Sequence, residues 1–226
     1  MGQEFYIVTS PEDVSTVYKN TNTKIFDYNI QVKDILGIFG INRQTIDMLF
    51  EDRFNGKSWM DLSHENLKLQ MHPGTKLDKL QGTLLSTLDQ SLNWDSVSKN
   101  LELPGSTKNE KVVSLYRWSS EVLVDAGTIA FYGNALYRIA PTLLSDFLIF
   151  DDEAWKLYSK YPYIAARKMY QYKEICEKAF QRYVDLPAEE RDDASWIVKT
   201  LEQDTRGLGV TDAYQISPNL FVLHRL

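Results

Sequence analysis

A histidine and a lysine four residues apart are the residues of this sequence whose types and spacing best suit the binding of a ligand group. His64 begins a segment that starts like the zinc-protease pattern His-Glu-x-x-His, but Lys68 occupies the position of the second histidine. A lysine ammonium group cannot ligate zinc, so the sequence does not predict a metalloprotease. On a helix these two side chains share one face, where they suit an anionic group such as a phosphate or carboxylate. The simpler interpretation is a solvated helix face.

The single cysteine is the other reactive side chain to be weighed. Cys176 lies inside an expected helix between Glu174 and Glu177, whose carboxylates would raise the pKa of its thiol. One cysteine forms no internal disulfide and no multi-cysteine zinc or iron–sulfur site. We interpret Cys176 as a partly buried structural residue. From its residues alone, the sequence indicates no catalytic group and no metal site.

Composition narrows the class of protein. The chain has 226 residues, of which 43% are hydrophobic and 25% charged, as in an ordinary globular protein. Its formal net charge of -6 argues against a nucleic-acid partner, because such proteins normally carry a basic surplus. No run approaches the ~18 apolar residues of a membrane span, and the first residues do not resemble a secretory signal. As written, the sequence predicts a soluble chain.

Helices are the elements expected to position these residues. Leucines recur at three- and four-residue spacing between Leu77 and Leu92, which predicts an amphipathic helix after the turn at Pro73. One short buried strand is predicted at Phe5–Thr9, just before the helix start at Ser10. No repeat or linker divides the chain, so we expect a mainly α domain. Helices are expected over residues 11–19, 32–39, 43–51, 62–70, 75–92, 112–132, 165–184 and 189–205.

Several segments, taken in order along the chain, carry a further signal. In this order they resemble haem-thiolate monooxygenases of the cytochrome P-450 superfamily, most of all a fungal branch near the sterol 7α-hydroxylase and prostacyclin synthase type. The resemblance runs from Phe5 to about Asp212. The segments that carry it are Phe5–Val14, Met71–Leu77, Phe131–Leu136, Asp151–Trp155, Leu186–Arg191 and Ala194–Trp196.

The resemblance implies a function and a cofactor. Residues 1–213 would form part of a cytochrome P-450 fold, a helical domain with a short N-terminal strand, and the cofactor would be haem. The complete enzyme would take electrons from a reductase and insert oxygen into an apolar, lipid- or sterol-like substrate. In this family a basic or aromatic pair on the third helix holds a haem propionate, and the matching positions here are His64 and Lys68.

The resemblance also implies that parts of the enzyme lie outside this chain. The family's iron ligand is a cysteine in a Phe-rich, Gly-containing loop, and Cys176 lacks that context. We therefore expect a fragment truncated at both ends, inactive without its C-terminal half. The complete enzyme, with its membrane anchor, is expected at the endoplasmic reticulum.

The last residues, 214–226, are expected to differ from the family. After Asp212 the family enters its long central helix, whereas this segment contains Pro218 and shows no amphipathic period. We expect an irregular, non-homologous tail, from an unspliced intron, a frameshift or an alternative end. The alternative to the whole haem-enzyme interpretation is a non-enzymatic helical module that binds an apolar ligand or a protein partner.

Overall fold

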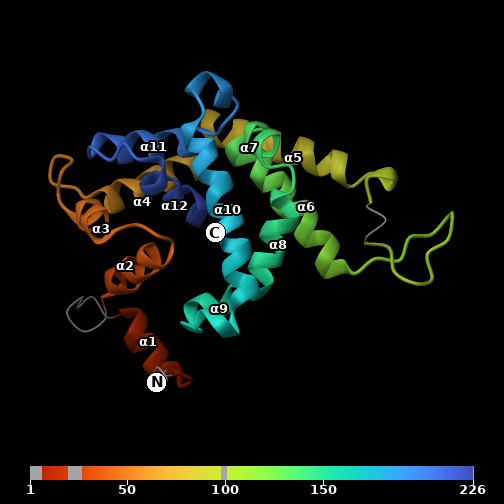
Figure 1. The fold of residues 1–226 in the computed structure, drawn as a ribbon, viewed down its shortest axis with the longest axis horizontal. Helices are drawn as coiled ribbons and strands as arrows, with labels where there is room; N and C mark the ends of the chain where they lie inside the picture. The colour runs from red at the N-terminus through yellow and green to blue at the C-terminus, as the bar shows by residue number, and fades with distance from the viewer. Residues whose placement is uncertain (1–6, 20–26, 98–100, 226) are drawn as a thin grey trace.

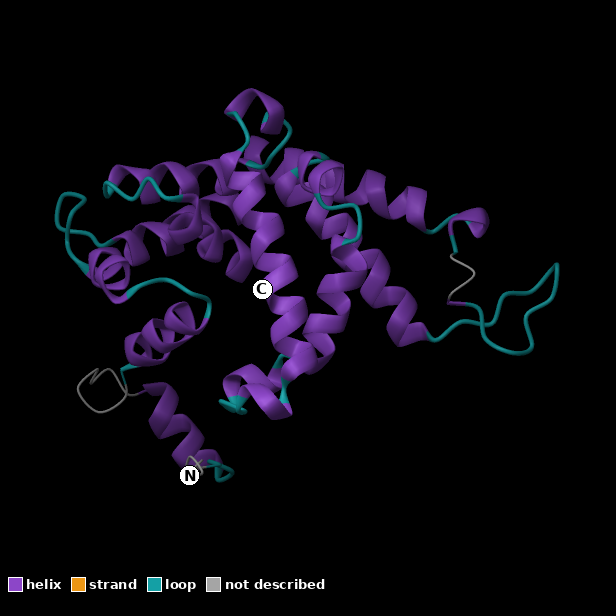
Figure 2. Ribbon diagram, in the orientation of Figure 1, coloured by secondary structure: helices purple, strands orange, loops and turns teal. Residues whose placement is uncertain are grey.

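The computed structural model describes residues 7–19, 27–97 and 101–225 as helices joined by turns and loops (Figure 1). Among these residues no strand forms, and an isolated antiparallel bridge joins Glu102 to Val113 (Figure 2). The prediction of a mainly α chain is confirmed. The α-helices are α1 Pro11–Lys19, α2 Tyr28–Ile38, α3 Arg43–Phe50, α4 Trp59–Met71, α5 Thr75–Ser91, α6 Leu115–Tyr132, α7 Ala135–Ile139, α8 Leu143–Glu153, α9 Trp155–Tyr158, α10 Arg167–Asp185, α11 Trp196–Gly207 and α12 Ala213–Arg225. Short 3-10 helices lie at Trp94–Ser96, Tyr163–Ala165 and Ala188–Arg191.

Helix starts follow side chains that cap backbone amides. The Ser10 hydroxyl accepts a hydrogen bond from the Asp13 amide at 3.1 Å, so α1 begins where the sequence predicts. The α4 helix begins at Trp59 rather than at the expected Leu62. The reason is a capping box in which Ser58 and Asp61 each bond the backbone amide of the other, which starts the helix about one turn earlier.

The expected strand at Phe5–Thr9 does not form where the structure describes it. Ile7–Thr9 have no regular structure, and Phe5 and Tyr6 lie outside the described residues. The Ile7 side chain is 85% exposed. A strand needs a neighbouring strand to satisfy its backbone N–H and C=O groups, and none accompanies Ile7–Thr9 within the described part of the chain.

The α10 helix is the centre around which the others pack. It lies between α8 and α12 (Figure 1). Its buried face carries Met169, Cys176, Phe180 and Tyr183, each 0% exposed. The position of α10 agrees with the helix expected over 165–184. The residues of its buried face recur at spacings that are multiples or sums of three and four, as on one side of a helix. The α5 and α6 helices pack together beside this core, and α11 packs against α4 and α12.

The C-terminal segment differs most from its prediction. Ala213–Arg225 is a helix with Pro218 inside it, so the expectation of an irregular tail is wrong. The proline removes one backbone N–H and costs a helix about 3 kcal/mol. Against this, Ile216, Leu220 and Phe221 are each 0% exposed, and burying each such side chain contributes about 1.5–3 kcal/mol. Their combined burial exceeds the cost of the proline, so tertiary packing imposes the helix.

Hydrogen bonds from α6 and from the turn before α3 hold α12 in place, and a bond from α10 supports the α6 residue. The Tyr132 hydroxyl on α6 donates to the Leu220 carbonyl at 2.7 Å, and the Tyr183 hydroxyl on α10 donates to the Tyr132 carbonyl at 3.0 Å. At the start of α12, the Gln215 side-chain oxygen accepts from the Asn42 amide at 2.8 Å, which links α12 to the turn before α3. These bonds fix the position of α12 along its axis.

A histidine near the end of α12 is enclosed by aromatic rings. The His224 ring centroid lies 4.4 Å from that of Phe147, and its Nε2 atom lies 2.8 Å from the Thr128 hydroxyl. The Thr128 hydroxyl donates its hydrogen to the Val124 carbonyl at 2.6 Å, so it accepts from Nε2–H and leaves Nδ1 without a proton. Nδ1 is buried without a hydrogen-bond partner among the described residues. Burial lowers the pKa of His224 to about 4, so the ring stays neutral at pH 7.

Truncating a buried α12 side chain tests whether this segment belongs to the core. We expect Leu220→Ala to lower the free energy of unfolding by about 2–5 kcal/mol, measured by urea denaturation, because it opens a cavity among packed side chains. The control is Tyr214→Ala on the same helix, where the side chain is 50% exposed. Equal, small effects of both changes would contradict the packed helix.

The lowered pKa of the half-buried His224 ring predicts a loss of stability in acid. The ordinary pKa of 6.5 applies to the unfolded chain, and the folded value is about 4. The stabilisation from neutral His224 is therefore complete above about pH 6.5, declines as the pH falls and is lost near pH 4, with a total of about 3 kcal/mol. We expect His224→Gln to flatten the pH dependence of unfolding between pH 6.5 and 4, and the control for replacing a histidine by glutamine is His72→Gln at an exposed site.

Candidate functional site

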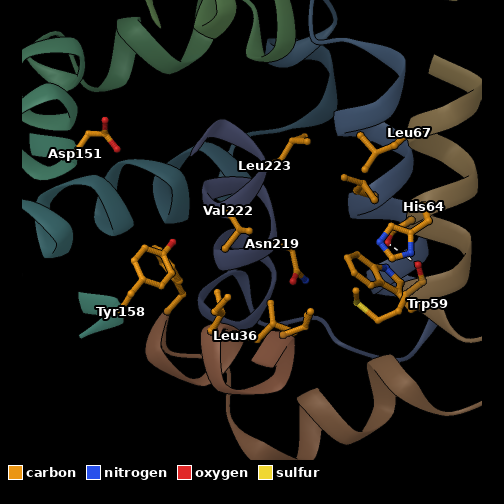
Figure 3. Close-up of a pocket in the computed structure, with 15 residues that line it drawn as sticks. Leu36, Trp59, His64, Leu67, Asp151, Tyr158, Asn219, Val222 and Leu223 are labelled. Atoms are coloured by element: carbon orange, nitrogen blue, oxygen red, sulfur yellow. Dashed lines mark hydrogen bonds between the residues drawn. The ribbon is translucent and has the colours of Figure 1, made fainter. Parts of the chain in front are cut away.

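An apolar cavity of about 320 Å³ lies between α2, α4 and α12 (Figure 3). This volume is within the range of ~300–1,000 Å³ that is usual for small-molecule sites. One wall is the face of α2 on which apolar residues recur at three- and four-residue spacing. The apolar lining consists of Val32, Ile35 and Leu36 of α2, Phe39 directly after α2, Met60 and Leu67 of α4, Leu201 of α11, and Val222 and Leu223 of α12.

Two polar side chains line this cavity without hydrogen-bond partners. Asn219 on α12 is 6% exposed, and neither its amide oxygen nor its amide nitrogen makes a hydrogen bond with another described residue. Trp59 at the start of α4 is 5% exposed, and its indole N–H is also without a partner. In Figure 3 both side chains extend into the space between α12 and α4. Buried polar atoms are normally paired, so two exceptions in one cavity point to a ligand.

Two separate features of the structure position the Trp59 indole and the Asn219 amide. The capping box of Ser58 and Asp61 fixes the first turn of α4, and its hydrogen bonds to Ser58 lower the pKa of the Asp61 carboxyl. Trp59 is the first residue of this turn, so the cap sets where its indole lies. Asn219 immediately precedes the buried pair Leu220 and Phe221, whose packing sets the rotation of α12 and thereby the direction of Asn219.

The remaining polar lining residues are already engaged or lie at the edge. The Ser63 hydroxyl donates to the Met60 carbonyl at 2.8 Å. Asp151 and Tyr158 line the cavity away from Trp59, and each has an interaction within the structure (Figure 3). The cavity therefore has an apolar body and one end at which Asn219 and Trp59 offer free hydrogen-bonding groups.

His64 and Lys68 differ in whether they line this cavity. Both lie on α4, one helical turn apart, and both are exposed. The His64 side chain lines the cavity, whereas Lys68 is not part of its lining. Neither residue makes a hydrogen bond or an ion pair with the other described residues, so both remain available to an external anionic group. The prediction that they hold a haem propionate stays a prediction.

The described residues do not fit a complete haem site. Cys176 is 0% exposed on α10 and does not line the cavity. Burial, with added repulsion from Asp146 and Glu177, raises the pKa of its thiol to about 12, so it is no source of thiolate. Within the described residues, no group of three His, Cys, Asp or Glu side chains could hold a metal ion. The structure buries Cys176 completely, where the sequence predicted partial burial, and we derive no oxygen chemistry from this chain.

Sequence reasoning missed both free polar residues of the cavity. Trp59 and Asn219 come from segments far apart in the chain, and no spacing rule connects them. Asn219 also lay in the segment expected to be irregular. Its one local signal was a polar residue directly before the apolar run Leu220–Leu223.

Comparisons with known proteins do not assign the chain to a family. No family model matches it, and no curated protein and no solved structure is significantly similar to it. Among the described residues, no helix has both the length and the apolar character needed to cross a membrane. The site must therefore be interpreted from its own geometry.

A haem titration tests the assignment of Cys176 to the core. We expect the purified chain, titrated with haem, reduced and exposed to carbon monoxide, to give no thiolate-type Soret band, because the Cys176 thiol is buried and protonated. Cys176→Ala should give the same spectra as the wild type. A thiolate-type band that disappears in Cys176→Ala would contradict this assignment.

Proposed function

We propose that this helical domain binds an apolar small molecule of lipid or sterol-like type in the cavity between α2, α4 and α12. The observation that carries the proposal is an apolar cavity of ligand size that also contains two buried, unpaired polar groups, Trp59 Nε1 and the Asn219 amide. Its apolar walls gain free energy by removing a ligand's hydrocarbon surface from water, about 25 cal/mol per Å². Sites of this kind combine an apolar lining with a few fixed polar groups.

We further propose that the complete protein is a haem-dependent monooxygenase, in which this cavity receives the substrate. The ordered segments between Phe5 and Asp212 support this proposal. So does the helix that begins at Ala213, because the resembled family enters its long central helix after Asp212. In this proposal His64 and Lys68 hold a haem propionate, and a reductase and a C-terminal half that carries the iron ligand complete the enzyme. The fragment alone is inactive.

The second candidate is a non-enzymatic module that binds an apolar ligand by itself. The burial of α12, with Leu220 and Phe221 both 0% exposed and Tyr132 bonded to the Leu220 carbonyl, favours this candidate. A helix anchored in this way closes the core from within the chain. Both candidates use the same cavity, and they differ in whether haem is required.

A matched pair of substitutions on α4 tests ligand binding in this cavity. Leu67 lines the cavity, and Leu69 on the same helix is 52% exposed. We expect Nile red to bind the wild type and to be displaced by a sterol such as cholesterol. Leu67→Trp should weaken both at least tenfold, because an indole occupies the space that the ligand needs.

The exposed position of Leu69 provides the control for this experiment. Leu69→Trp should bind Nile red and sterol as the wild type does, because its indole faces water. Both variants should unfold cooperatively, which shows that the loss is local. Equal binding by the wild type and Leu67→Trp would remove the cavity as the ligand site.

A further inference from the structure

The two unpaired groups in the cavity define what a ligand must present to them. The Asn219 amide offers two N–H donors and one oxygen acceptor, and Trp59 Nε1 offers one donor. A buried donor or acceptor without a partner destabilises the fold, because the group has lost its hydrogen bonds to water and gained none in return. The folded protein bears this cost at both residues, and a ligand that pairs them would recover part of it on binding.

We propose that Trp59 and Asn219 bind an uncharged hydroxyl or primary amide group at one end of the apolar ligand. This inference rests on the proposed function of the cavity. A ligand hydroxyl oxygen can accept from Trp59 Nε1–H while its hydrogen is donated to the Asn219 oxygen. A primary amide can in addition accept from the Asn219 N–H. A plain hydrocarbon or a halide end leaves the protein groups unpaired.

The charges around the cavity select against an anionic end group. Among the described residues no lysine or arginine lines the cavity, whereas Asp151 does. His64 is exposed at the edge, where water solvates it. A carboxylate taken into this apolar space would lose its hydration without a cation as partner, which is costly. Alcohols and primary amides avoid this cost and still meet the donors and the acceptor.

An ordered water is the competing occupant. A cavity with several polar partners can hold a water that satisfies the amide and the indole N–H. If such a water stays in place when a ligand binds, the Asn219 amide and the Trp59 indole N–H are already paired, and binding would not favour a hydroxyl over an apolar end group of similar size. The comparison of such ligands therefore separates the two occupants.

The experiment compares ligands that share one chain and differ at one end. Displacement of Nile red is measured with 1-dodecanol, dodecanamide, dodecanoate and 1-chlorododecane. We expect the wild type to bind 1-dodecanol and dodecanamide about tenfold more tightly than 1-chlorododecane, which corresponds to one or two net hydrogen bonds. Dodecanoate should bind more weakly than 1-dodecanol.

Three variants assign this preference to named groups. Asn219→Leu, of similar size, should bind 1-dodecanol and 1-chlorododecane equally, and Trp59→Phe should lose part of the preference. Trp118→Phe is the matched control, because the Trp118 indole N–H is also buried and unpaired but lines a different cavity. It should keep the full preference. Loss of the preference in Trp118→Phe but not in Asn219→Leu would overturn the proposal.

Thermal stability gives a second, independent measurement. Without ligand, Asn219→Leu should melt at a higher temperature than the wild type, because it removes an unpaired amide from the interior. A lower melting temperature would mean that the amide already has a stabilising partner, which would overturn the proposal.

The outcomes distinguish this inference from the proposed function. If none of the ligands displaces Nile red from the wild type, the proposed function fails. If 1-dodecanol and 1-chlorododecane displace it equally well, the cavity binds apolar ligands and only the hydrogen-bonding inference fails.

Discussion

Burial of α12 among the aromatic side chains of the core is the interaction on which the rest of the structure depends. The Phe221 ring lies 5.3 Å from Phe39 and Phe180 and 5.5 Å from Phe150, measured between centroids, so one residue joins α12 to three separate parts of the chain. The Tyr132 hydroxyl fixes α12 along its axis through the Leu220 carbonyl. Without α12 the core would expose these rings to water.

The same packing builds the cavity. Leu220 and Phe221 face the core, and this orientation directs Asn219, Val222 and Leu223 toward the cavity. A binding wall and a core face thus come from one helix, as its 3.6-residue period allows. The cavity cannot keep its shape if α12 shifts, which ties ligand binding to the stability of the domain. The unpaired groups at Trp59 and Asn219 reduce that stability, a cost that proteins accept at sites of function.

Several helices of this fold follow from the sequence because their signals are local. The sequence predicted a helix over 165–184, where α10 lies, and Ser10 predicted the start of α1. The prediction for the C-terminal segment was wrong because Pro218 is a local signal that opposes a helix, while the burial that overrides it involves residues far away in the chain. The short strand at Phe5–Thr9 was predicted from residue type alone, and a strand also requires a partner that local sequence does not supply.

For the candidate site, the sequence by itself determined the residue types: one cysteine without a ligand context, a histidine and a lysine on one helix face, and an apolar, aromatic-rich chain. Only the tertiary structure decided that Cys176 is sealed in the core, that His64 but not Lys68 lines the cavity, and that Trp59 and Asn219 lie in it unpaired. The physical reason is that helix periodicity and capping act within a few residues, whereas burial and hydrogen-bond pairing depend on which helices meet. No pattern along the chain specifies which helices come into contact.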